Sequence, residues 1–185
     1  KSSNIRVTSG NSEMDKMCDG GYFRDSIVLL SGATGTGKTL MATEFLAGGV
    51  HAGEKALFFA FEESQEQIFR NAKGWGYDFE QMEKEGNLKV AGIYPESEAL
   101  EDHLLKIKDE IKRFKPNRIA IDSLSALERI STDKGFREFI IALTSYVKQE
   151  EITCLPRPLP HWRAERPLRK PISPPSPIQL SCSDT

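Results

Sequence analysis

The sequence predicts an α/β fold in which a mostly parallel β-sheet carries helices on both faces. Short apolar runs without the alternation of a half-exposed strand recur along the chain, and segments with helical spacing separate them. Strands that alternate with helices of this length imply crossover connections and parallel pairing. A glycine-rich stretch at residues 32–37 lies between the first apolar run and the first helix. The first strand–loop–helix unit is therefore the best-defined part of the prediction.

The first half of the body supplies three strands and two helices. Strands are predicted at residues 27–30, 56–61 and 88–93. Ser64 and Gln67 have the spacing of a capping box, which begins a helix that stops near Gly74. The earlier helix has apolar residues at Leu40, Met41, Phe45, Leu46 and Val50, and its end is predicted from Gly48, Gly49 and Gly53.

The second half contains the clearest amphipathic helix, which begins near Ser97 and ends at Pro116. A fourth strand is predicted at residues 118–122, and a further helix has apolar residues from Phe136 to Val147. Residues 151–153 are typical of the approach to a fifth strand, but we expect that strand to be missing. The sheet is therefore expected to be incomplete on its C-terminal side.

The composition changes near Cys154. Eight of the 10 prolines lie at or after residue 156, whereas the last glycine is Gly135 and the last phenylalanine is Phe139. Residues 1–154 have a net charge of −5, and residues 155–185 have a net charge of +3. We expect one domain at 1–154 and a proline-rich, basic, disordered or aberrant tail at 155–185.

Several classes of protein are excluded by the composition. No run approaches the roughly 18 apolar residues of a membrane span, and no signal peptide is evident. Three cysteines without metal-ligand spacing argue against a disulfide framework and favour a cytoplasmic location. The acidic body argues against nucleic-acid binding. Because Lys1 is not an initiator methionine, we expect the sequence to begin inside a longer chain.

The glycine-rich stretch and the two residues after it match the P-loop pattern G-x-x-x-x-G-K-[ST], set between a predicted strand and a predicted helix. Such loops wrap the phosphates of ATP with backbone N–H groups, while the lysine reaches the β- and γ-phosphates and the hydroxyl binds Mg²⁺. The predicted phosphate-binding residues are Gly32, Thr34, Gly35, Thr36, Gly37, Lys38 and Thr39.

Acidic residues at two predicted strand ends supply the other candidates. Asp122 ends an apolar strand, where the second acidic residue of such NTPases holds the Mg²⁺ shell; the alternative is a solvated strand end. Glu62 and Glu63 end the second strand and would lie beside the phosphates if that strand neighbours the P-loop strand. We predict Glu62 as the general base and Glu63 as its partner, with Lys38 as the third catalytic residue. The alternative is a solvated helix start.

Two further residues keep both a functional and a structural interpretation. Trp75 lies between Gly74 and Gly76; it is predicted to contact the nucleotide base, and the alternative is an aromatic side chain packed over a loop. Arg129, shortly after the Asp122 strand, is either a residue that acts at a neighbouring subunit or an exposed surface residue.

The P-loop and four further phrases closely resemble the C-terminal ATPase domain of the KaiC circadian clock family. The phrases are FAFEES at 59–64, YPES at 94–97, RIAIDSLSAL at 118–127 and KQEEIT at 148–153. The resemblance runs from about residue 3 to residue 153. It implies a RecA-like fold, a hexameric ring with ATP between subunits, Ser/Thr autokinase and autophosphatase activity, and KaiA and KaiB as partners. It also implies that Glu62 and Glu63 are the catalytic glutamates.

The resemblance stops at Cys154, before the strands and the Ser-Thr phosphoacceptor pair with which the family continues. Residues 171–185 can be back-translated so that a shifted frame reads HISTITDTIILLRY, which resembles that continuation. We hypothesise that the tail is a frameshift product. Autokinase activity of this chain is therefore expected to be impaired.

Two other functions are weighed against this one. The first is a DNA-dependent ATPase related to RecA or DnaB, which the acidic body disfavours. The second is a non-enzymatic role in which the proline-rich tail binds an SH3-like groove.

Overall fold

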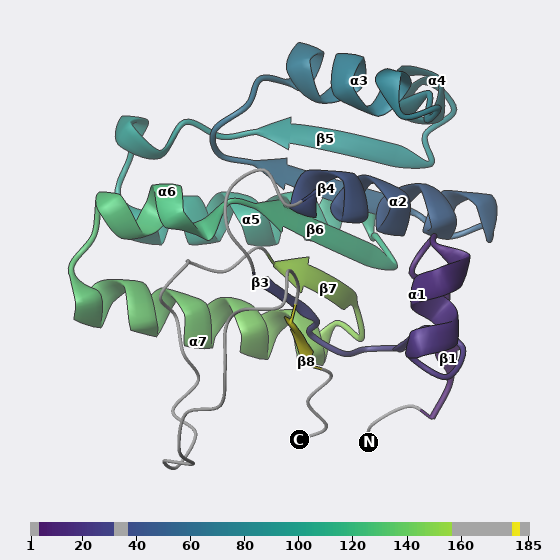
Figure 1. Ribbon diagram of the computed structural model, residues 1–185. Coiled ribbons are helices and arrows are strands. Elements are labelled where there is room, and N and C mark those ends of the chain that lie inside the picture. Colours follow the sequence, from purple (N-terminus) through teal and green to yellow (C-terminus); the bar gives the residue numbers. More distant parts are fainter. Residues whose placement is uncertain (1–3, 32–36, 157–178, 182–185) are drawn as a thin grey trace, which may run out of the picture.

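A computed structural model describes residues 4–31, 37–156 and 179–181. It confirms the α/β fold: a parallel four-stranded sheet lies between helices on its two faces (Figure 1). Four of the predicted phosphate-binding residues, Gly32, Thr34, Gly35 and Thr36, lie outside the described residues. None of the helices in the described part is long and apolar enough to cross a membrane.

The elements follow one another in the order β1 (Arg6–Val7), α1 (Ser12–Met17), β2 (Tyr22–Phe23), β3 (Leu29–Ser31), α2 (Lys38–His51), β4 (Ala56–Ala60), α3 (Gln65–Gly74), α4 (Phe79–Lys84), β5 (Leu88–Gly92), the 3₁₀ turn η1 (Pro95–Ser97), α5 (Leu100–Phe114), β6 (Arg118–Asp122), α6 (Leu124–Arg129), α7 (Asp133–Gln149), β7 (Thr153–Pro156) and β8 (Gln179–Ser181).

The main sheet has the strand order β5-β4-β6-β7, and all neighbours are parallel. The expectation of a missing fifth strand is wrong, because β7 pairs with β6 from Arg118 opposite Thr153 onward. β7 in turn lies beside the segment that enters β3: Ile27 forms a parallel bridge to Cys154. The P-loop strand is thus placed at the β7 side of the sheet, and it also pairs antiparallel with β8.

Burial of both faces explains why the strands lack hydrophobic alternation. Along β4 and the next residue, Leu57, Phe59 and Phe61 belong to one core cluster. Ala56, Phe58 and Ala60 belong to the other. Since side chains alternate across a strand, each face needs its own apolar set, and the strand is apolar throughout.

Two helical layers cover these faces. α2, α3 and α4 supply the apolar side chains of one layer, and α5, α6 and α7 supply those of the other. The capping box of α3 is confirmed, with Ser64 and Gln67 each bonded to the other's backbone. The prediction for the end of α2 is wrong at Gly48 and Gly49, which lie inside the helix.

Two boundaries also differ from the prediction. α5 begins at Leu100 instead of near Ser97, because Ser97 is the last residue of the 3₁₀ turn η1. The composition change at Cys154 falls inside β7, which continues to Pro156 because its apolar residues fill both core clusters.

Candidate functional site

The described part of the P-loop begins the helix α2. Gly37 caps the helix with φ of 81°, a left-handed conformation that favours glycine over residues with a Cβ. Lys38 is the first residue of α2 and is only 8% exposed. The sequence therefore places a buried cation and the backbone N–H groups of a helix N-terminus at one point, an arrangement suited to phosphate.

Thr39 and Asp122 meet at this point. Thr39 lies in the first turn of α2 and Asp122 ends β6, and the two are 83 residues apart in the chain. The Thr39 hydroxyl donates a hydrogen bond to Asp122 Oδ2 over 2.9 Å. Asp122 is 7% exposed, so its carboxylate is held in a fixed place. The structure thus brings together the two residues that the sequence predicts as the Mg²⁺ site.

The chemistry of these donors fits Mg²⁺. A hydroxyl and a carboxylate are hard oxygen ligands, which this cation prefers over nitrogen or sulfur. Across the three described ranges there is no group of three His, Cys, Asp or Glu residues that could hold a metal by itself. Mg²⁺ does not require one, since it is usually bound by one or two protein oxygens together with water and substrate phosphates.

Glu62 and Glu63 lie at the same edge of the sheet, just beyond β4. The sequence predicted that they lie beside the phosphates if their strand neighbours the P-loop strand. The two strands are not neighbours, because β6 and β7 lie between β4 and the P-loop strand. The segment that carries them is joined to β6 instead. The backbone N–H of Phe61 donates to the carbonyl oxygen of Asp122 over 2.8 Å, so Glu62 directly follows a residue bonded to the end of β6.

The side chain of Glu62 forms an ion pair with Arg129, whose Nη2 lies 2.9 Å from Glu62 Oε1. Arg129 is the last residue of α6, and its side chain is 60% exposed. The pair spans 67 residues of sequence, so no local spacing indicated it. Arg129 is thus exposed, as one of its two interpretations expects, and it also contacts the residue predicted as the general base.

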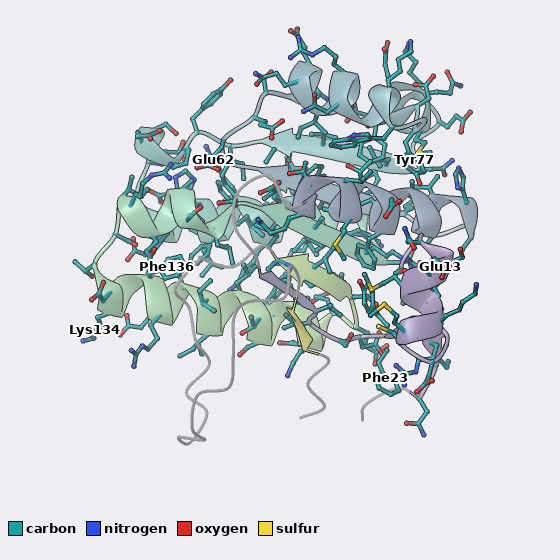
Figure 2. All side chains as sticks on the ribbon, viewed as in Figure 1. Glu13, Phe23, Glu62, Tyr77, Lys134 and Phe136 are labelled. Carbon is teal, nitrogen blue, oxygen red and sulfur yellow. The ribbon has the colours of Figure 1, made fainter. Side chains whose placement is uncertain are left out.

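The other two predicted residues lie with α3. Glu63 Oε2 accepts a hydrogen bond from Asn71 Nδ2 on α3 over 3.0 Å. Trp75 follows the last residue of α3 and is 40% exposed. In Figure 2, Tyr77, two residues later, lies at the opposite end of the sheet from Glu62. Within one chain, Trp75 is therefore not part of the Lys38, Thr39 and Asp122 site.

Comparisons with known proteins agree with this geometry. The family model described as "ATPase: KaiC" matches residues 7–155. The chain is 68% identical over 152 residues to "Circadian clock protein KaiC3" of Synechocystis sp., covering 82% of this chain and 30% of that protein. It is 60% identical over 153 residues to "Circadian clock oscillator protein KaiC" of Picosynechococcus sp., covering 83% of this chain and 30% of that protein.

The chain thus spans about 30% of the length of these relatives. The alternative of a DNA-dependent RecA or DnaB relative is not favoured by these matches. A parallel sheet with helices on both faces, a P-loop helix whose Thr39 contacts Asp122, and a family match over residues 7–155 lead to one conclusion. The chain belongs to the KaiC ATPase family.

Proposed function

We propose that this chain binds ATP with Mg²⁺ and hydrolyses the γ-phosphate. The observation that carries the proposal is the hydrogen bond of 2.9 Å between Thr39 and Asp122. It joins the P-loop helix to the end of β6 at two oxygen donors, beside the buried Lys38.

The roles follow from the positions. Lys38 neutralises charge on the β- and γ-phosphates, and the α2 N-terminus, from Gly37 onward, supplies backbone N–H donors. Thr39 and Asp122 would hold the Mg²⁺ ion on its protein side. When bound, that ion supplies neutralisation of the charge that develops on the phosphate oxygens.

Glu62 is the proposed general base. Its carboxylate takes a proton from the attacking water, while the water oxygen bonds to the γ-phosphorus and the bond to the β–γ bridging oxygen breaks, giving ADP and inorganic phosphate. The Arg129 guanidinium holds Glu62 Oε1 and so restricts the rotamers of this exposed side chain. Glu63, which is bonded to Asn71, is proposed as its partner at the end of β4.

Two threonines of α2 provide a matched test of nucleotide binding. Thr39→Ala removes the hydroxyl proposed to bind Mg²⁺. Thr43→Ala removes a buried hydroxyl one helical turn later, which donates a hydrogen bond to the carbonyl oxygen of Thr39. We expect the Mg²⁺ concentration for half-maximal binding of a fluorescent ATP analogue to rise about 10–100-fold in Thr39→Ala. Thr43→Ala should leave it within twofold of the unmodified chain. Equal effects of the two substitutions would contradict the proposal.

The proposed role of Glu62 as general base is tested by measuring the rate of ATP hydrolysis in a single turnover. Glu62→Gln should bind the nucleotide normally and slow γ-phosphate release by about 10²–10⁴-fold. Glu66→Gln, an exposed glutamate in the first turn of α3, is the control and should be without effect. If Glu62→Gln hydrolyses ATP at the unmodified rate, water activation must be assigned to another group.

The wider functions are proposed for the longer protein of which this chain matches a part. We propose a hexameric ring with ATP between subunits, Ser/Thr autophosphorylation and dephosphorylation, partnership with KaiA and KaiB, and a role in circadian timing. We propose a cytoplasmic location, because the three cysteines of the sequence lack the number and spacing of a disulfide framework. In a ring, Trp75 is proposed to contact the base of a nucleotide.

This chain itself should show weak or no autophosphorylation, because the family's Ser-Thr pair is absent. Incubation with labelled ATP followed by mass spectrometry tests this, and robust transfer of the γ-phosphate to the chain would overturn it.

Sequencing the encoding DNA tests the proposal that the tail is a frameshift product. A gene in which no alternative frame restores the family's strands would contradict it.

A further inference from the structure

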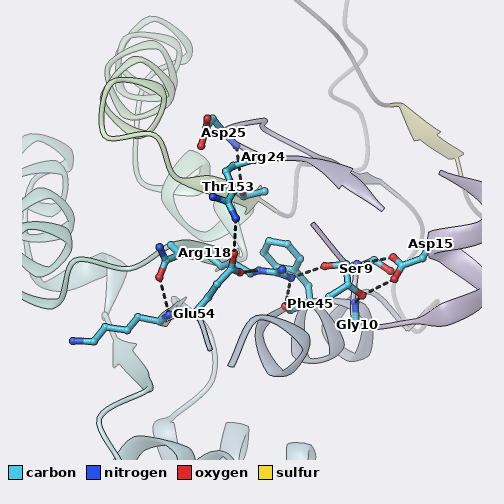
Figure 3. Close-up of polar contacts among 12 residues, drawn as sticks. Ser9, Gly10, Asp15, Arg24, Asp25, Phe45, Glu54, Arg118 and Thr153 are labelled. Carbon is cyan, nitrogen blue, oxygen red and sulfur yellow. Dashed lines mark hydrogen bonds and ion pairs between the residues drawn. The ribbon is translucent and has the colours of Figure 1, made fainter. Parts of the chain in front are cut away.

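A single arginine is buried at the amino end of β6. Arg118 is 1% exposed, and its guanidinium lies among groups from three separate segments (Figure 3). Nε donates to Glu54 Oε2, and Nη1 donates to the carbonyl oxygens of Thr8 and Phe45 over 2.5 and 3.0 Å. A buried charge is tolerated when it is paired and hydrogen-bonded, and Arg118 meets both conditions.

The C-terminal half of α2 is packed directly on this side chain. Arg118 Cζ lies 4.9 Å from the centre of the Phe45 ring, a cation–π distance. At Gly49 the helix approaches so closely that an added Cβ would lie 2.5 Å from Arg118 Cδ and 2.7 Å from Nε. The absence of a side chain at Gly49 therefore lets the helix backbone rest on the arginine.

Arg118 belongs to β6 and packs on α2, and each of these two elements carries one residue of the proposed metal site. α2 carries Thr39 at its first turn and Phe45 about 9 Å further along its axis. β6 begins at Arg118 and ends at Asp122, and each of its residues is buried. Hydrogen bonds therefore join the helix to the strand both at Arg118 and between Thr39 and Asp122.

The contacts of Arg118 are directional, which apolar contacts between a helix and a strand are not. Its planar guanidinium presents donors in fixed directions, and two of them are used by a helix carbonyl and by Glu54. Sliding α2 along β6 would break these hydrogen bonds inside the protein, where an unpaired donor is expensive.

We propose that Arg118 is a positioning residue that sets how α2 lies along β6 and thereby holds Thr39 against Asp122. The consequence for Mg²⁺ binding rests on the proposed function, whereas the placement of the α2 N-terminus does not. The contacts of Arg118 described above are to Thr8, Phe45 and Glu54, so its proposed effect on the metal site is carried by α2 and β6.

Two substitutions perturb the arginine in different ways. Arg118→Lys keeps the charge but removes the planar arrangement of donors. Gly49→Ala keeps the guanidinium of Arg118 but forces its side chain to move, and a gain in helix propensity of about 1 kcal/mol offsets part of the overpacking cost. The control is Arg24→Gln, which removes the other arginine on Glu54, an exposed side chain at 3.5 Å that does not contact α2.

The first measurement is hydrogen exchange by mass spectrometry on the nucleotide-free full chain. In both variants we expect the amides at the start of α2, residues 38–43, to exchange about two- to thirtyfold faster, while Arg24→Gln leaves them unchanged. A purely local role predicts faster exchange only near Thr8 and at residues 45–54. That local pattern would overturn the proposal.

The second measurement is the Mg²⁺ dependence of binding of a fluorescent ATP analogue. We expect half-saturation to shift upward by about two- to thirtyfold in both variants and not in the control. If the unmodified chain shows no Mg²⁺-dependent binding, the proposed function fails, and the exchange data still decide the role of Arg118. If the unmodified chain binds the analogue in a Mg²⁺-dependent way and neither variant shifts the Mg²⁺ concentration for half-saturation, the link from Arg118 to the proposed metal site is refuted.

Discussion

Replacing Gly48 of α2 with alanine should destabilise the protein, although the same change usually stabilises a helix. Gly48 faces the N-terminal loop, and a Cβ added there would lie 2.6 Å from Gly10 Cα and 3.0 Å from Gly10 N. The Gly10 backbone has little room to move away from α2. It already has a φ of 85°, and it lies against the backbone of Glu44, which also belongs to α2. The two backbones touch without side chains between them.

The expected magnitude follows from these contacts. Carbon atoms pack best at about 3.5–4.0 Å, so the loop backbone would have to move by about 1 Å. Such overpacking typically lowers the free energy of unfolding by about 1–3 kcal/mol, whereas the gain in helix propensity is about 1 kcal/mol. Moving the loop also disturbs the Thr8 carbonyl bonded to Arg118. We expect a net loss of about 1–2 kcal/mol.

Urea unfolding followed by circular dichroism measures this change. Gly74→Ala is the matched control: Gly74 is the last residue of α3, and no described atom lies within 4 Å of a Cβ placed there. It should gain about 0.5–1 kcal/mol. The contact between Gly10 and Gly48 would be refuted as a determinant of stability if Gly48→Ala were as stable as Gly74→Ala.

Three predictions concern titratable groups. Burial acts to raise the pKa of Asp15, but hydrogen bonds from the preceding loop and the charge of Arg118 outweigh it and lower the pKa below 3.8. Its contribution to stability is therefore complete above pH 3.8 and lost as the pH falls through the lowered value, so Asp15→Asn should lower the melting temperature at pH 7 and lose its effect in stronger acid. Burial and the charge of Glu151 raise the pKa of Asp25, so the ionised form costs stability at neutral pH. Asp25→Asn should add about 0.5 kcal/mol at pH 7 in urea unfolding, and the gain should vanish below pH 3.8, where the carboxyl is protonated in both states. Burial raises the pKa of the Cys154 thiol to about 12, so iodoacetamide at pH 8 should modify Cys18 and leave Cys154 intact until the protein unfolds, as read by mass spectrometry.

Local patterns in the sequence predicted the elements that depend on neighbouring residues. The capping box at Ser64 and Gln67 is confirmed because its two hydrogen bonds lie within one helical turn. The apolar strands around Phe58 and Ile121 are confirmed because burial on both faces leaves a continuous apolar run. β7 was missed because its partners lie far away in the sequence and its proline suggested a tail.

The proposed metal site illustrates the same division. Thr39 and Asp122 were each identified from a local pattern, and their meeting follows from parallel strands whose carboxyl ends share one edge. The ion pair of Glu62 with Arg129 could not be predicted, because it depends on how α6 turns after β6. Nothing in the spacing of Arg118 distinguished it from an exposed strand-end arginine.

The sequence by itself determined the α/β class, the P-loop helix, the acidic residues at the strand ends and the resemblance to the KaiC family. These properties depend on residues that are close along the chain or on the side-chain period of one element. The tertiary structure decided the strand order, the course of α2 through Gly48 and Gly49, and the burial of Arg118. These depend on which distant backbones approach each other, and a local pattern does not contain that information. Gly48 shows the difference: its helix propensity follows from the residue type, but the Gly10 backbone packed against it decides the sign of a substitution.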